Sequence, residues 1–150
     1  MAVLRDEPYG AFNFLVSLGG QTGDGDTIVG GFSEVSGLGA SIEYMEYRNG
    51  NDKSFSSIKL PGLRKANDVT LKRGVIGSLD LFTWLNSVAN GTRDRRQVTI
   101  TLLDEGRSAV VTWRLRNALP KKWEGPHLRA KGSCVAIEEL TLVCDGIEME

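Results

Sequence analysis

Apolar and polar side chains alternate along several short stretches of the chain, which is the pattern of a strand with one buried face. The first stretch places Phe12, Phe14, Val16 and Leu18 on one side. The period-two pattern or an extended composition recurs in residues 28–38, 41–48, 68–73, 95–103, 109–117 and 133–148. The sequence therefore predicts a chain built mainly from strands.

Two of these stretches predict a hairpin, because the tight turn Asp104–Gly106 separates them. The residues expected on its apolar side are Val98, Ile100, Leu102, Val111, Trp113 and Leu115. In the last stretch the alternation changes phase at Glu138 and Glu139, which predicts a bulge or a strand buried on both faces.

One amphipathic helix is predicted over residues 78–90. Ser78 is the expected N-cap, Asp80 favours the first turn through the helix dipole, and Gly91 ends the helix in a left-handed conformation. Leu81, Phe82, Leu85, Val88 and Ala89 fall on the face expected to lie against a sheet.

Three segments show no period and are predicted to be irregular. These are residues 19–27, residues 48–67 with a Pro-Gly turn at Pro61–Gly62, and residues 118–128. A polar loop as long as 48–67 is usually functional or docked on something. Strands, one helix and more strands together predict an α+β chain, mainly β, with antiparallel sheets.

The 150 residues suit a single domain, 1–150, large enough to bury a core. A net charge of -1 gives no bulk attraction to nucleic acid or to an anionic membrane. The N-terminus lacks the pattern of a signal peptide and no stretch is long enough to span a bilayer, so we expect synthesis and assembly in the cytoplasm. Cys134 and Cys144 are expected to be reduced.

Candidate chemistry is sparse. The glycines of Ser36–Ser41 precede a strand and not a helix, so they do not form a dinucleotide-binding loop. Asp24–Asp26 lacks the further acids of a calcium loop, and a single histidine, His127, with two distant cysteines does not make a metal site. No catalytic set, cofactor site or metal site is predicted, and the chain is not expected to be an enzyme.

Several strands are predicted to have two different faces. One face carries apolar side chains, and the other is rich in Thr, Ser, Arg, Gln and Glu. One helix cannot cover both sides of the sheets, so the polar side must face solvent, a lumen or neighbouring subunits. Unpaired strand edges also favour pairing between copies. Closed rings of identical chains would meet both requirements.

Five segments in order resemble the T4-like phage tail tube protein family, and in particular the inner tube proteins of extracellular contractile injection systems. They are "GFSEVSGLGASIEYMEYRNGND", "LPGLRKANDVTLKRGVIGSLDLFTWLNSV", "RRQVTITLLDEG", "WRLRNALPKKWEGP" and "VAIEELTLVCDGIE". The resemblance runs from about Tyr9 to Glu148 and implies two packed antiparallel sheets, sandwich- or barrel-like, with one flanking helix. It also implies hexameric rings stacked into a hollow tube inside a contractile sheath, with baseplate and spike proteins as partners and possible cargo in the lumen.

The resemblance implies three sets of contact residues. The long loop 48–67 and an N-terminal arm, residues 1–9, are expected at contacts between subunits or rings, through Tyr9, Tyr47, Asn49, Leu60, Pro61, Leu63 and Lys65. The lumen-facing candidates are Ser41, Glu43, Thr99, Thr101, Thr112 and Arg114. The sheath-facing candidates are Lys121 and Lys122.

Two other functions remain open from the sequence. One is a secreted tube protein of the type VI, haemolysin-coregulated kind that also carries effectors. The other is a small hydrolase or ligand-binding β-barrel that acts alone. Rings or filaments in negative-stain electron microscopy would favour the tube proteins, whereas a persistent monomer with a saturable ligand would favour the solitary barrel.

Overall fold

The computed structural model describes residues 4–19 and 28–150. Within these ranges the elements are β1 (Phe14–Leu18), β2 (Ile28–Gly30), β3 (Phe32–Ser36), β4 (Ala40–Tyr47), β5 (Ile58–Ala66), β6 (Val69–Gly74), α1 (Asp80–Ala89), β7 (Arg96–Leu103), β8 (Ala109–Glu124), β9 (Ile137–Val143) and β10 (Gly146–Met149). Residues 20–27 of the predicted loop 19–27, with Asp24–Asp26, and the first three residues of the N-terminal arm lie outside the described residues.

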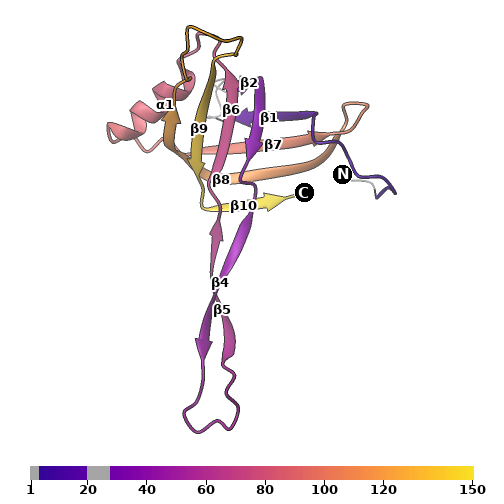
Figure 1. Cartoon of the computed structure of the whole chain (residues 1–150), viewed down its shortest axis with the longest axis vertical. Coiled ribbons are helices and arrows are strands. Elements are labelled where there is room, and N and C mark those ends of the chain that lie inside the picture. The colour runs from indigo at the N-terminus through magenta and orange to yellow at the C-terminus, as the bar shows by residue number, and fades with distance from the viewer. Residues whose placement is uncertain (1–3, 20–27) are drawn as a thin grey trace.

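All the strand pairs are antiparallel, as predicted, and one sheet has the order β2-β1-β7-β8-β9-β6-β3 with β10 also paired to β8. The sheet consists of two halves that share β8 and run in clearly different directions (Figure 1). We call the first half β2, β1, β7, β10 and the start of β8, and the second half the end of β8 with β9, β6 and β3. β4 and β5 form a separate two-stranded sheet.

One hydrophobic core lies between the two halves. The first half contributes Val16, Leu18, Val98, Ile100, Leu115 and Ala118, and the second half contributes Val69, Leu71, Leu140 and Leu142. Leu81 and Trp84 of α1 complete the cluster. The prediction of two packed antiparallel layers is therefore confirmed, although the two layers belong to one bent sheet. Truncating one of these aliphatic side chains to alanine costs roughly 2–5 kcal/mol of folding stability.

β8 is longer than the sequence predicts, because residues 118–124, which were expected to be irregular, continue the strand to Glu124. Two features hide the alternation there. Asn117 has a left-handed backbone (φ 51°), and the pairing register with β9 shifts between Pro120 and Lys122. A proline is tolerated at such a bulge because no ladder hydrogen bond from its nitrogen is needed.

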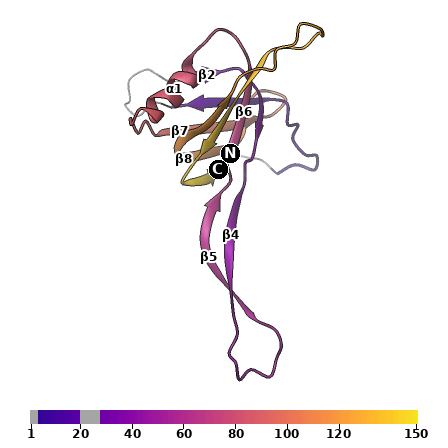
Figure 2. The same cartoon turned by 60° about the vertical axis from the view of Figure 1, so that its left-hand side comes forward.

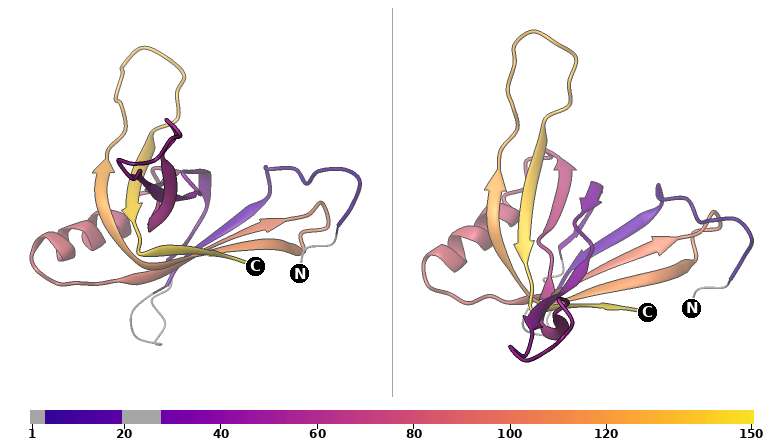
Figure 3. Two further views of the ribbon diagram at one scale, coloured as in Figure 1. Left: turned by 90° about the horizontal axis from the view of Figure 1, so that it is seen from below. Right: turned by 60° about the horizontal axis from the view of Figure 1, so that its bottom comes forward.

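α1 runs over Asp80–Ala89, inside the predicted range, and fills the side of the core next to β8 (Figure 3). Its buried residues are Leu81 and Trp84, so the predicted apolar face is wrong in omitting Trp84 and in including Phe82 and Ala89, which are exposed. Phe82 packs edge-on against Trp123 instead. The N-cap position is Leu79 without a side-chain cap, so Ser78 is not the N-cap. Gly91 has φ 101°, which confirms the left-handed end of the helix.

The closing stretch is two strands, β9 and β10, separated at Cys144–Asp145. The apparent change of phase is neither a bulge nor two-sided burial: Glu138, Leu140 and Leu142 are buried in regular alternation. Glu138 occupies a core position because it pairs with the equally buried Arg73 of β6. Both cysteines are free thiols, Cys134 exposed and Cys144 half-buried, as predicted.

The prediction of a loop over 48–67 is wrong for residues 58–66, which form β5 and pair with β4 along a long hairpin that projects from the body (Figures 1 and 2). The Pro-Gly pair is not a turn. Pro61 lies opposite Tyr44 in a strand with a single partner, so its missing N–H can face outward. Gly62 sits at a register shift, where a Cβ atom would lie 2.9 Å from the Glu43 carbonyl oxygen.

Candidate functional site

The first half of the sheet presents an uncovered polar face on the side opposite the core. The pairing brings four lumen-facing candidates together there: Thr99 lies opposite Arg114, and Thr101 lies opposite Thr112. Ser17 extends the row across β1 because it lies opposite Thr99, and on the same side Leu15, opposite Thr101, is an exposed apolar side chain. We call this surface, made of Ser17, Thr99, Thr101, Thr112, Arg114, Arg116, Glu148 and Glu150, the polar face.

The charges of the polar face are paired with one another. Arg114 Nη1 lies 2.7 Å from Glu150 Oε1, and Arg116 Nε lies 3.3 Å from Glu148 Oε1. These two arginines and two glutamates give the polar face, as far as the structure describes it, no net charge. The charged side chains of this surface are therefore balanced.

Both outer strands of the first half have a free edge. β2 pairs only with β1, and β10 pairs only with β8, among the residues that the structure describes. An unpaired edge presents N–H and C=O groups that another strand can bind. The two edges lie on opposite sides of the polar face, which allows neighbouring copies to join edge to edge.

The two remaining lumen-facing candidates lie on the hairpin and not among the threonines. Ser41, at the root of β4, shares a cleft of about 470 Å³ with Arg116 of the polar face and with Gly146 of β10. Glu43 lies farther along β4 and forms an ion pair with Lys65 of β5. The structure thus places Ser41 beside the polar face and Glu43 away from it.

The outer part of the hairpin carries an exposed apolar face. Met45 lies opposite Leu60, and Tyr47 opposite Ile58, so the four side chains share one side of the two strands. All four are exposed. An exposed group of large apolar side chains on a projecting hairpin is typical of a protein–protein contact.

The end of the hairpin, residues 48–57, is held in one shape by its own polar groups. The Arg48 guanidinium donates to the carbonyl oxygens of Ser54 and Asp52 at 2.9 and 3.0 Å. The Tyr47 hydroxyl donates to Asn49 Oδ1 at 2.5 Å. We call this segment the hairpin tip, and its internal bonds reduce the entropy that binding would cost.

The N-terminal arm is clamped beside the turn between β7 and β8. Arg5 makes two hydrogen bonds of 3.0 Å to Glu105, one to each carboxylate oxygen, and lies 3.8 Å from the centre of the Tyr9 ring. The hydrogen bond from Arg5 lowers the pKa of Glu105. Tyr9, an inter-subunit candidate, therefore lies at the end of the first half and not on the hairpin with the other six.

The two sheath-facing candidates are adjacent in β8: Lys121 is the extra residue of the bulge and Lys122 follows it, and both are exposed. Lys121 Nζ lies 2.7 Å from Asp68, and Lys122 Nζ lies 2.6 Å from Glu124. The hydrogen bond from Lys122 lowers the pKa of Glu124. Their charges are thus partly neutralised within the chain.

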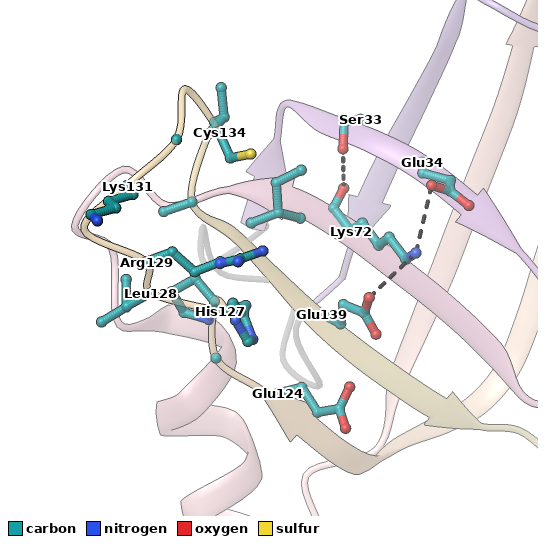
Figure 4. Close-up of a pocket in the computed structure, with 16 residues that line it drawn as sticks. Ser33, Glu34, Lys72, Glu124, His127, Leu128, Arg129, Lys131, Cys134 and Glu139 are labelled. Carbon is teal, nitrogen blue, oxygen red and sulfur yellow. Dashed lines mark hydrogen bonds and ion pairs between the residues drawn. The ribbon is translucent and has the colours of Figure 1, made fainter.

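A groove of about 920 Å³, which the sequence analysis missed, lies where the loop 125–136 overhangs the solvent face of the second half (Figure 4). Its floor is a cross-strand ladder, with Lys72 opposite both Glu34 and Glu139 at 3.7 and 3.3 Å. The hydrogen bond with Glu139 raises the pKa of Lys72. The alternation of β6 and β9 carries the signal for this ladder, because Lys72 and Glu139 sit between core positions.

The described residues contain no group of His, Cys, Asp and Glu side chains placed to hold a metal ion. In the same part of the chain, the only helix is too short and too polar to cross a membrane.

The family model described as T4-like virus tail tube protein gp19 matches residues 10–148. Among solved structures, a chain of the PVC sheath–tube complex of an extracellular contractile injection system, in its extended state, is 31% identical over 97% of this chain and 93% of its own length, with a TM-score of 0.83. A chain of the anti-feeding prophage baseplate is 26% identical over 97% of each chain, with a TM-score of 0.86. No curated protein sequence matches.

The likeness to an Hcp1 structure is of fold alone. Hcp1 from Flavobacterium johnsoniae is 14% identical over 90% of this chain and 94% of its own, with a TM-score of 0.51. The chains of the two contractile particles share the mainly β fold, with antiparallel sheets and one helix, at the higher TM-scores of 0.83 and 0.86. With a family model that spans nearly its whole length, the chain belongs to the family of the T4-like virus tail tube protein gp19, a family of structural tube proteins and not of enzymes.

Proposed function

We propose that this chain is the inner tube subunit of an extracellular contractile injection particle, in which six copies close into a ring and rings stack into a hollow tube inside a sheath. The observation that carries the proposal is the near full-length match, at 31% identity, to a chain of a sheath–tube complex. A second relative belongs to a baseplate. Sheath, baseplate and spike proteins are the partners that this role requires.

The polar face is the proposed wall of the lumen. The second half and α1 lie on the core side of the first half, so the bulk of the subunit sits behind the wall and only the uncovered side can line a narrow bore. Edge-to-edge pairing of β2 and β10 between neighbours would remove both free edges. A wall that is mostly polar, with paired charges and with Leu15 as an exposed apolar side chain, gives cargo little apolar surface to adhere to.

The hairpin is the proposed contact between subunits. Leu60, Pro61 and Leu63 lie in β5, where Leu60 belongs to the exposed apolar face and Leu63 lies at the bulge. Tyr47, Asn49 and Lys65 lie on the same hairpin. Apolar side chains this exposed are stabilised by burial against a neighbour, at roughly 25 cal/mol per Å² of apolar area.

The exposed side of β8 at Lys121 and Lys122 is the proposed contact with the sheath. Both lysines are exposed and each is paired with a carboxylate of the same chain. Such surface pairs exchange partners at small cost, typically below about 1 kcal/mol each. An electrostatic contact of this kind suits two cylinders that must separate when the sheath shortens.

The proposed assembly also implies where the protein is found in the cell and after release. We propose that the subunits assemble in the cytoplasm and become part of an extracellular particle after release. Cargo, where present, would occupy the lumen.

Assembly of the purified protein tests the proposal. Rings with six-fold symmetry and stacked tubes are expected in negative-stain electron microscopy, with a ring mass of six chains by mass photometry. A sample that stays monomeric at every concentration, with and without particle nuclei such as isolated baseplates, would contradict the tube function.

A further inference from the structure

The sequence contains two Asn-Gly pairs, Asn49–Gly50 and Asn90–Gly91. In such a pair the backbone nitrogen of the glycine can attack the side-chain amide of the asparagine, because glycine has no Cβ atom to block the approach and its backbone adopts many conformations. The reaction also needs a nitrogen that is not already hydrogen-bonded, and space for the ring that forms. The structure provides these conditions at the first pair and not at the second.

Asn49–Gly50 lies in the hairpin tip, which projects from the body of the subunit (Figures 1 and 2). Both residues are exposed, and they begin a turn in which the Asp52 N–H donates to the Asn49 carbonyl oxygen at 3.1 Å. Within residues 4–19 and 28–150 the Gly50 N–H has no acceptor. A Cβ atom at Gly50 would meet no atom within 4 Å. The nitrogen is therefore free to react, and the space around it is open.

The side-chain amide of Asn49 is polarised by a neighbouring hydroxyl. Tyr47 donates to Asn49 Oδ1 at 2.5 Å. When a nitrogen attacks the amide carbon, negative charge develops on this oxygen, and a donor that is already in place stabilises the tetrahedral intermediate as an oxyanion hole does. The segment 47–50 thus holds an electrophile, a free nucleophile and a hydrogen-bond donor.

The second pair, Asn90–Gly91, is also exposed, but it ends α1 and its amides are engaged. The Asn90 N–H donates to the Asn86 carbonyl oxygen at 3.0 Å, and the Gly91 N–H donates to that of Val88 at 3.1 Å. The glycine is fixed at φ 101°. Attack by its nitrogen first requires this end of the helix to open, so folding should protect Asn90.

We propose that Asn49 is a site of spontaneous deamidation, in which Gly50 supplies the nucleophile and Tyr47 the stabilising hydroxyl. The Gly50 nitrogen loses its proton to water and bonds to Asn49 Cγ. The bond from Cγ to Nδ2 breaks, and that nitrogen takes up a proton and leaves as ammonia. Water then opens either C–N bond of the cyclic imide and leaves aspartate or isoaspartate at position 49.

The reaction changes the charge and the shape of the hairpin tip. Each converted subunit gains one negative charge in the turn that also contains Asp52. Isoaspartate in addition lengthens the backbone of this turn, which weakens the hydrogen bond between Asp52 and position 49. The inference concerns the single subunit and does not depend on the proposed tube function.

Peptide mapping of the full-length subunit tests the proposal. Folded and urea-denatured samples are aged side by side at the same pH, and mass spectrometry with electron-transfer fragmentation measures aspartate and isoaspartate at positions 49 and 90. In the denatured chain the two Asn-Gly pairs should convert at similar rates. In the folded chain Asn49 should convert at least as fast as in the denatured chain, and Asn90 roughly tenfold more slowly than in the denatured chain.

Two variants separate the parts of the site. Tyr47→Phe keeps the ring and removes the donor, so conversion at position 49 should slow roughly fivefold, the factor that one hydrogen bond of ordinary strength is worth. Gly50→Ala fits the folded tip, since its Cβ meets no atom within 4 Å, but it crowds the attacking nitrogen, and conversion should nearly cease. Neither variant should change the rate at Asn90, which is the internal control for folding.

Three results would overturn the inference. Slower conversion of Asn49 in the folded than in the denatured chain would mean that the tip protects the amide. Equal rates at the two asparagines of the folded chain would mean that the fold does not distinguish the pairs. An unchanged or faster rate in Tyr47→Phe would remove the role of the hydroxyl.

Discussion

Arg73 and Glu138 form an ion pair inside the protein, with Nε 2.5 Å from Oε1, and their side chains are 2% and 6% exposed. They are direct cross-strand partners of β6 and β9. Trp123 Nε1 donates to the other carboxylate oxygen at 3.2 Å, so both acceptor atoms of Glu138 are used. A charged pair thus takes the place of two apolar core residues at one end of the second half.

Removing one member of this pair should destabilise the subunit strongly. Glu138→Gln leaves the buried guanidinium of Arg73 without a counter-charge, and we expect a loss of roughly 3–5 kcal/mol in the free energy of unfolding. Denaturant titration of the subunit measures it. The matched control is Glu34→Gln, whose ion pair is exposed, with an expected change within about 0.5 kcal/mol.

The double variant R73L/E138L separates charge from packing. Because it leaves no unpaired charge, it should be more stable than Glu138→Gln. If Glu138→Gln changes the unfolding free energy no more than Glu34→Gln does, the pair has no role in stability.

Acid should release the N-terminal arm. The hydrogen bond from Arg5 lowers the pKa of Glu105, so the attraction is fully present above the ordinary glutamate pKa of about 4.3 and is lost as pH falls through the lower, folded value. Hydrogen exchange of residues 4–13 should therefore accelerate only below that pH. In Glu105→Gln the segment should exchange fast already at neutral pH, with no further transition. An acid transition that survives in the variant would show that another group holds the arm.

The bulge in the hairpin should be essential for assembly but not for folding of the body. Gly62→Ala puts a methyl group 2.9 Å from the carbonyl oxygen of Glu43, which must displace β4 or β5. Tube yield by sedimentation should fall, while the thermal transition of the body stays unchanged. Gly50→Ala is the matched control, because a Cβ there meets no atom within 4 Å. Equal tube yields from the two variants would rule out a role for the hairpin shape.

Thiol labelling should locate the lumen wall. In a C134S background, Thr112→Cys of the polar face should react in assembled tubes with a small maleimide but not with one attached to a large polymer. Lys121→Cys, on the exposed side of β8, should react with both. The amount of each label is read by intact mass. Rapid reaction of Thr112→Cys with the large reagent along whole tubes would place the polar face on the outside.

The sequence predicts the regular parts of the fold well, because alternation reports burial of one strand face. Val98 and Ile100 are buried, and Thr99 and Thr101 lie on the opposite face, as the period requires. Prediction fails where a residue breaks the period for a tertiary reason. Glu138 reads as a polar position, although pairing with Arg73 makes it a core residue.

The candidate site is predictable only in part for the same reason. Pro61 and Gly62 read as a turn, yet a two-stranded hairpin tolerates both, since it has outer edges and one bulge. The grouping of Thr99, Thr101, Thr112 and Arg114 follows from the hairpin register and could be found from sequence. The groove could not, because the path of the loop 125–136 over β3, β6 and β9 depends on contacts between distant parts of the chain.

The single strand β8 is common to both halves of the sheet, and this has a mechanical consequence. A force that pulls the halves apart along β8 loads the hydrogen bonds to β7 and to β9 together, in shear, and the covalent backbone carries the tension between them. Ladders loaded in this way break all at once and not bond by bond from one end. We therefore expect the subunit to unfold abruptly at a high force and not to extend gradually as the force rises.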